Sequence, residues 1–198
     1  MKMHNASNQL YVLEFAYQEA VYRAKRKREE RDERIADFFE QQSANNCAVV
    51  SVYHYLAYLG LVNRTHFHHF NHKTICAKYD SKEKKCRDGI PVTKIMQYLP
   101  PAIQTIIERE TPGWIILDSD EGDDISVIRA TFQRLIEGDK PFIASIDHHA
   151  IVVIGKDKED DRYVHVIDSD NHGTGVGKRQ IKHILMKTTL RIAWLNFG

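Results

Sequence analysis

An almost continuous apolar stretch runs from residue 47 to residue 59. Apolar positions fall on nearly every side of a helix drawn through this stretch, so we expect the helix to be buried all round. Asn45 or Asn46 can cap its start, and Gly60 follows where helices commonly end in a left-handed residue. The pattern therefore predicts a buried helix over residues 47–59.

Helical and strand-like patterns follow one another in the later part of the chain. Apolar residues at helical spacing predict helices over residues 92–99, 125–137 and about 177–186. Runs of β-branched and apolar residues predict strands over residues 114–117, 142–154, 163–168 and 190–195. Residues 103–107 fit either a strand or a helix, and Asp123 or Asp124 is expected to cap the 125–137 helix. These elements predict an α+β fold.

Residues 1–40 differ in pattern from the rest and are interpreted as an N-terminal helical extension, with the folded domain over residues 41–198. An apolar stripe marks one helix from about residue 10 to residue 40. Its middle, residues 25–34, alternates between basic and acidic side chains, which is typical of a solvated helix face. The alternative is an arm that binds a partner or regulates the domain.

Residues 61–89 are basic and rich in histidine and cysteine. The side chains able to bind metal are His66, His68, His69, His72, Cys76 and Cys86. Their spacing matches no established zinc pattern, so an irregular basic connection is the expected structure. A zinc site and a Cys76–Cys86 disulfide stay open as alternatives.

Composition excludes several classes of protein. The 198 residues carry a net charge of +1, which gives no overall attraction to nucleic acid or to an anionic membrane. No apolar run is long enough to span a membrane, and the N-terminus has no apolar signal core. Three cysteines make no disulfide framework, so a reducing compartment is the default. We expect a protein that is cytoplasmic as synthesised, with export as an effector or toxin as the alternative.

Cys47 is a candidate nucleophile because of its place at the start of the predicted helix. The helix dipole and the free backbone N–H groups of the first turn favour a thiolate over a thiol. Gln41, six residues earlier, carries an amide N–H₂ that can reach an oxyanion forming beside the sulfur. The alternative is an inert buried cysteine, which is common in proteins.

A base for this nucleophile is predicted on the strands that follow. If 142–154 and 163–168 form a hairpin with residues 155–162 as its loop, His149 can lie directly opposite Asp168. The pairs Ile151–Val166 and Val153–Val164 then share their face, and the 47–59 helix is expected to cover it. A carboxylate there can hold one ring nitrogen while the other serves the thiolate. A register shifted by one residue would place His148 there instead.

These motifs resemble the papain-like cysteine peptidase superfamily. They are Gln41-x5-Cys47 before an apolar helix, the run from His149 to Gly155, and the run from Tyr163 to Asp168. Within the superfamily the chain is most similar to the bacterial branch related to the bacteriocin-processing, double-glycine leader peptidases. The resemblance implies a papain-like fold, in which a helical half carrying the nucleophile packs on a mainly antiparallel β-sheet. It also implies Cys47 as nucleophile, His149 as general base and acid, Asp168 as orienting residue and Gln41 as oxyanion donor.

The preferred hypothesis is a cysteine endopeptidase that acts on a protein or peptide substrate and needs no cofactor. The same residues can serve a glutamine deamidase or a transglutaminase, as in papain-like bacterial effectors and toxins, because those enzymes attack an amide carbonyl too. A binding module on a papain-like fold without activity is the third hypothesis. No nucleic-acid partner is expected, and the N-terminal helix is the candidate for binding another protein.

Overall fold

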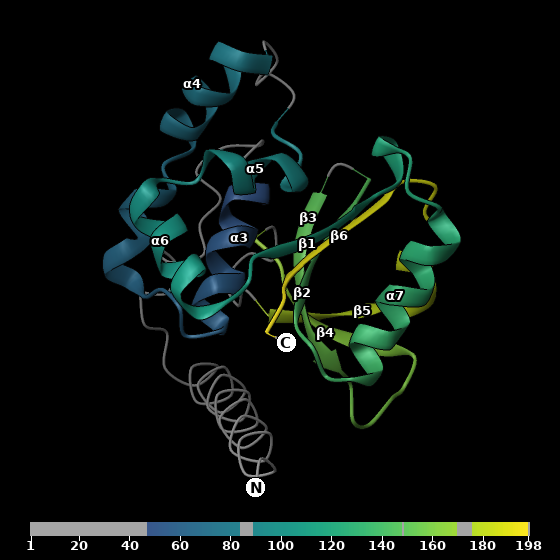
Figure 1. Ribbon diagram of the computed structural model, residues 1–198. Coiled ribbons are helices and arrows are strands. Elements are labelled where there is room, and N and C mark those ends of the chain that lie inside the picture. The colour runs from purple at the N-terminus through teal and green to yellow at the C-terminus, as the bar shows by residue number, and fades with distance from the viewer. Residues whose placement is uncertain (1–46, 84–88, 148, 170–175, 198) are drawn as a thin grey trace, which may run out of the picture.

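Within the described residues, 47–83, 89–147, 149–169 and 176–197, six strands form one antiparallel sheet in the order β1-β6-β2-β3-β4-β5 (Figure 1). The structure is a computed structural model. The strands are β1 (Trp114–Asp118), β2 (Phe142–Ile146), β3 (His149–Lys156), β4 (Tyr163–Ile167), β5 (Val176–Gln180) and β6 (Leu190–Leu195). All neighbouring strands run antiparallel, as the predicted mainly antiparallel sheet requires.

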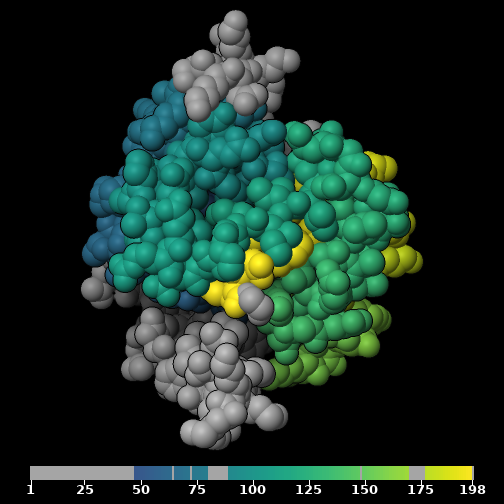
Figure 2. Space-filling view, in the orientation of Figure 1, coloured from purple at the N-terminus to yellow at the C-terminus, as the bar shows by residue number. Residues whose placement is uncertain are grey.

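Helices cover both faces of this sheet, with the earlier helices on one face and α7 on the other (Figure 1). In chain order the helices are α3 (Cys47–Tyr58), η1 (Arg64–Phe70), α4 (His72–Glu83), α5 (Val92–Tyr98), α6 (Pro101–Glu110), η2 (Ser119–Glu121), α7 (Ile125–Glu137) and α8 (Ile181–Leu185). Figure 2 shows the early helices in contact with the half that contains the sheet and α7, and the yellow C-terminal segment reaches the surface between them.

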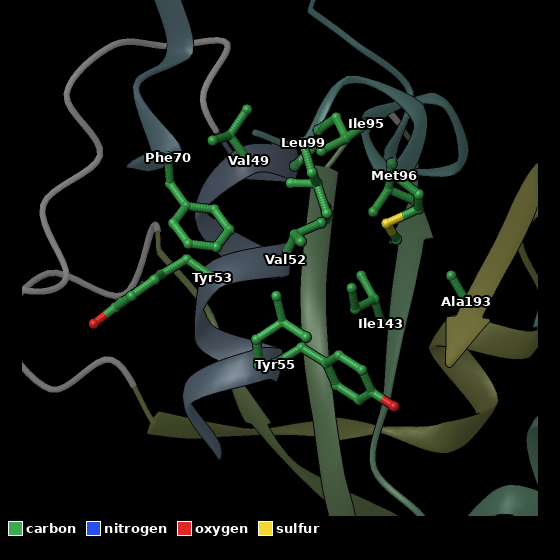
Figure 3. Packing of buried hydrophobic residues seen from close by; sticks show 14 of the residues in the cluster. Val49, Val52, Tyr53, Tyr55, Phe70, Ile95, Met96, Leu99, Ile143 and Ala193 are labelled. Carbon is green, nitrogen blue, oxygen red and sulfur yellow. The ribbon is translucent and has the colours of Figure 1, made fainter. Parts of the chain in front are cut away.

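The first hydrophobic cluster surrounds α3. Val52, Tyr53 and Leu56 are fully buried there, and ten of the twelve residues of α3 are buried. On the sheet side, α3 packs against Ala150, Val152 and Ile154 of β3. On its other sides it meets side chains of η1, of α5 and of Leu99, the residue after α5, as Figure 3 shows for Phe70, Ile95 and Leu99. The prediction of a buried helix is therefore confirmed for residues 47–56, while residues 57–59 are half-buried and the helix ends at Tyr58.

The second hydrophobic cluster lies between α7 and the opposite face of the sheet. Ile128 and Phe132 of α7 are fully buried against strand residues. These strand residues are Phe142, Ala144, Ile151, Val153, Val164, Val166 and Ile192. The face of β3 that carries Ile151 and Val153 was expected to lie under the 47–59 helix, and this prediction is wrong. Both faces of β3 are apolar, so alternation could not decide which helix covers which face.

For several elements the structure confirms both the predicted type and the predicted first or last residue. The helix over 125–137 has the predicted bounds, and Asp124 caps it by accepting a hydrogen bond from the Ser126 backbone N–H at 2.7 Å. Gly60 has φ +74°, the left-handed conformation expected after α3. Strand β6 also has its predicted bounds, and the predicted α+β fold class is confirmed.

Other elements differ from their predictions. Residues 142–154 form two strands, because the chain turns near Asp147, whose φ is +46°. Residues 61–89, expected to be irregular, contain η1 and α4, which attach to the core through Phe70, Ile75 and Tyr79. Residues 103–107 belong to a helix, α6. The helix expected over 177–186 is preceded by strand β5, so only its second half is helical.

Two predictions involve residues that the structure does not describe. Residues 1–46 lie outside the description, so the helical extension over 1–40 stays a prediction. Cys76 is disulfide-bonded, in line with the disulfide alternative, while Cys86 lies outside the described residues. Among the residues that are described, no group of three metal-binding side chains gathers, and no helix is long and apolar enough to cross a membrane.

A buried polar network joins the helical half to the sheet. The Asp118 carboxylate, at the end of β1, accepts a hydrogen bond from the Thr93 hydroxyl of α5 at 2.9 Å. It also accepts one from Arg191 Nε of β6 at 3.0 Å, and Arg191 pairs with Asp120 as well. Since Asp118 and Arg191 are both buried, each charge depends on the other for compensation.

We predict that Arg191→Met lowers the free energy of unfolding by about 3–5 kcal/mol, because it removes the main partner of the buried Asp118 carboxylate. Urea denaturation measures this loss. Arg162→Met is the matched control, since Arg162 pairs with Asp160 at 2.6 Å on the surface and its loss should change stability little. Equal effects of the two substitutions would contradict the importance of the Asp118–Arg191 pair.

Candidate functional site

Cys47 is the first residue of α3 and is 8% exposed. Its position follows from the predicted helix start, so the positive end of the helix dipole lies at its side chain. Among the described residues, Cys47 is the free cysteine. The two predicted caps, Asn45 and Asn46, and the predicted oxyanion donor, Gln41, lie outside the described residues.

Contacts between α3 and β3 place Cys47 beside His149. Ser51 lies one helical turn after Cys47, and its hydroxyl donates a buried hydrogen bond of 2.8 Å to the Ala150 carbonyl. Ala150 is the residue after His149, and its backbone amide is hydrogen-bonded to Cys47. The Ala150 backbone is therefore bound on both sides to the first turns of α3, which brings the cysteine and the histidine together.

The pKa of the Cys47 thiol lies below its ordinary value. Burial acts in the opposite direction and is the largest single influence, because it raises the pKa by disfavouring the charged thiolate. Hydrogen bonds with the His149 side chain and with the backbone of Ala150 and Ala48, together with the charge of His149, lower the pKa and outweigh burial. The surroundings of Cys47 therefore favour the thiolate, which is the nucleophilic form.

His149 links Cys47 to a buried carboxylate. Its Nε2 lies 2.7 Å from Asp168 Oδ1, and the Asp168 side chain is fully buried. Because Nε2 is held by the carboxylate, Nδ1 is the ring nitrogen left for the sulfur of Cys47. The structure thus brings three of the predicted residues, Cys47, His149 and Asp168, into one hydrogen-bonded series. His148, the alternative base, lies outside the described residues.

The hairpin register that led to this pair is wrong by two residues. Val153 pairs with Val166 instead of Val164, and a bulge follows between Val153 and Gly155. Asp168 comes just after the end of β4, and His149 is the first residue of β3, so the two side chains meet at the ends of their strands. The side chains meet although their backbones are not direct partners, because diagonal neighbours in a sheet also come within reach of long side chains.

Arg179 is a residue of this site that sequence reasoning missed. It lies on β5, and its Nη2 donates a hydrogen bond of 2.6 Å to Asp168 Oδ2. Residues 177–186 were expected to be helical, and a helix would not have extended the sheet beside β4. Residues 176–180 read Val-Gly-Lys-Arg-Gln and show no alternation of apolar and polar residues, so the sequence carried no clear signal for this strand.

The arrangement can support nucleophilic attack on a carbonyl carbon. A cysteine with a lowered pKa, an imidazole bonded to it and a carboxylate bonded to that imidazole are the groups that covalent catalysis by a thiol requires. All three stand at the junction of α3 and the ends of β3 and β4. In the described part of the chain no metal-binding cluster accompanies them.

The comparison with family models agrees with the predicted resemblance. One similar solved structure is a double glycine motif protease from an AMS/PCAT transporter in complex with the leader peptide. It is 14% identical, with a TM-score of 0.43, over 77% of this chain and 86% of that chain. No curated protein matches the chain. The model of the Peptidase_C39 like family matches residues 35–198, which confirms the predicted resemblance and supports a cysteine peptidase. The chain belongs to the Peptidase_C39 like family.

Proposed function

We propose that this chain is a cysteine endopeptidase in which Cys47 is the nucleophile, His149 the general base and acid, and Asp168 the orienting residue. The observation that carries the proposal is the series of contacts from the Cys47 sulfur through the His149 ring to the buried Asp168 carboxylate. The family match adds support, since it covers all three residues. Gln41 keeps its predicted role as oxyanion donor within this proposal.

The reaction begins with attack of the Cys47 thiolate on the carbonyl carbon of a peptide bond. The carbonyl oxygen becomes an oxyanion, and the protonated His149 gives its proton to the leaving nitrogen as the C–N bond breaks. An amine product departs and a thioester remains on Cys47. His149 then takes a proton from a water molecule that attacks the thioester, and the carboxylic acid product leaves as the thiolate is restored.

Asp168 supports both steps without exchanging a proton. Its hydrogen bond holds His149 by Nε2, which keeps Nδ1 directed to the sulfur and stabilises the imidazolium. Full burial of the carboxylate keeps water from competing for this bond. A deamidase or a transglutaminase would use the same groups on a side-chain amide, so the products, not the triad, distinguish the three enzymes.

The proposal is tested by intact-mass spectrometry of a peptide library incubated with the wild type and with Cys47→Ala. We expect fragments that sum to the parent peptide plus one water, and we expect them with the wild type alone. A gain of about one dalton without fragments would indicate a deamidase, and amine incorporation with loss of ammonia would indicate a transglutaminase. An unchanged library would favour the binding module.

We predict that iodoacetamide alkylates Cys47 with a pH midpoint below that of an ordinary thiol, because its pKa is lowered. The midpoint should rise in His149→Ala, which removes a hydrogen bond and a charge that favour the thiolate. Mass spectrometry of the Cys47 peptide over a pH series measures both midpoints. His165→Ala is the control, since His165 lies on β4 beside Asp157 and should leave the midpoint unchanged.

We also predict that Asp168→Asn lowers kcat by about 10⁴-fold, the scale seen when the aspartate of a Ser-His-Asp triad is replaced by asparagine. The asparagine can fill the same space, so the free energy of unfolding should change far less than the activity. Steady-state kinetics and urea denaturation give the two values. Asp161→Asn, at an exposed carboxylate, should change neither, and an active Asp168→Asn enzyme would remove Asp168 from the proposed triad.

A further inference from the structure

We infer that Arg179 is a positioning residue that orients His149 through Asp168, an inference that rests on the proposed function. The two oxygens of the Asp168 carboxylate have different partners. Oδ1 lies 2.7 Å from His149 Nε2, and Oδ2 accepts a hydrogen bond of 2.6 Å from Arg179 Nη2. The carboxylate therefore lies between an imidazole on one side and a guanidinium on the other.

Burial makes this second partner important. The Asp168 side chain is 0% exposed, and a carboxylate removed from water is costly unless a charge and hydrogen bonds compensate it. Imidazole is charged during only part of the catalytic cycle, whereas an arginine stays charged at every working pH. The Arg179 guanidinium thus stays beside Asp168 as a compensating charge when His149 is neutral, and Oδ1 remains placed to accept the His149 N–H.

Arg179 also fixes the rotation of the carboxylate. The torsion about the Cβ–Cγ bond of an aspartate is broad, and the hydrogen bond from Arg179 to Oδ2 narrows it. With Oδ2 held by Arg179, Oδ1 is directed to His149 Nε2. The ring is then held so that Nδ1 points to Cys47. A small misplacement of a catalytic group can reduce the rate about 100-fold, so this constraint has a measurable consequence.

The sheet brings Arg179 to this place through the pairing of β4 with β5. Arg179 is opposite Val164, and Gly177 is opposite Val166 on the same face, one step closer to Asp168. Because Gly177 has no side chain, the long arginine side chain can lie along the strand past Val166 and reach the carboxylate. This geometry requires the strand that was not predicted for residues 176–180.

The neighbouring residue offers a matched control. Lys178 lies on the same strand and pairs with Asp157, a second buried carboxylate. The two pairs are alike in exposure, with side chains 49% and 0% exposed for Arg179 and Asp168 and 48% and 2% exposed for Lys178 and Asp157. A purely structural role would therefore give Arg179 and Lys178 similar effects on stability and similar, small effects on activity.

The experiment compares Arg179→Met and Lys178→Met in the full chain, each in the wild type and in Asp168→Asn. On a peptide that the wild type cleaves, we expect Arg179→Met to lower kcat/KM by about 10–100-fold and Lys178→Met by less than about 2-fold. In the Asp168→Asn background, Arg179→Met should have less than about 2-fold further effect, because residues acting through one group are not additive. Arg179→Lys should recover part of the activity, since the observed bond uses one nitrogen.

Equal losses in Arg179→Met and Lys178→Met, or a full Arg179→Met effect in Asp168→Asn, would overturn the inference. The pH profile of Cys47 alkylation gives a readout that needs no substrate. Its midpoint should rise in Arg179→Met, which loosens His149 and removes a positive charge, and stay unchanged in Lys178→Met. If the wild type cleaves no peptide, the proposed function fails. In that case the pH midpoint of Cys47 alkylation is the remaining test of whether Arg179 acts on the Cys47–His149 pair. An unchanged midpoint in Arg179→Met would overturn the inference about Arg179.

Discussion

Burial of α3 against β3 is the interaction on which the candidate site depends. Ser51 and Ala150 are 99 residues apart in sequence, yet a hydrogen bond of 2.8 Å joins them in the core. Fully buried side chains such as Val52 and Leu56 each contribute about 1.5–3 kcal/mol to holding the helix there. Apolar packing alone does not fix the position of α3 along β3. The hydrogen bond between Ser51 and Ala150 does, because it can form at one position only. That position sets Cys47 beside His149.

Local signals made much of the fold predictable. Asp124, Gly60 and the proline-bounded helix α5 mark element ends through backbone chemistry that needs no partner in space. Two of the candidate site residues were predictable from such ends, since Cys47 stands at the start of a predicted helix and Asp168 at the end of a predicted strand. His149 was expected inside one long strand, and it was chosen because it could face Asp168 and because the family resemblance pointed to it. What the pattern could not choose was the face of β3, because Ile151 and Val152 are equally apolar and each is buried under a different helix.

The remaining errors have tertiary causes. Helix α4 is mostly polar. Among its described residues, the buried ones are Ile75 and Tyr79, which attach it to the core. Its sequence therefore has no broad apolar stripe from which a helix could be predicted. The predicted β3–β4 register failed because β3 continues to Lys156, which pairs with Val164, whereas the strand was expected to end at residue 154. A bulge between Val153 and Gly155 then shifts the register by one residue, and alternation cannot foresee it. Strand β5 is mostly polar and lies at the edge of the sheet, so it lacks the apolar alternation of a strand, and its residues were included in the helix predicted over 177–186.

The polar edge strand has a consequence for how the site is built. Cys47, His149, Asp168 and Arg179 form a hydrogen-bonded series in which groups that can be negative and groups that can be positive alternate. Each group has a neighbour that can carry the opposite charge, which compensates the burial of Asp168 and Cys47. The half-exposed guanidinium ends the series near water, where a charge is least costly. The site therefore extends across α3, β3, the end of β4 and β5. A change in β5 that never touches the sulfur can still alter the orientation of the imidazole.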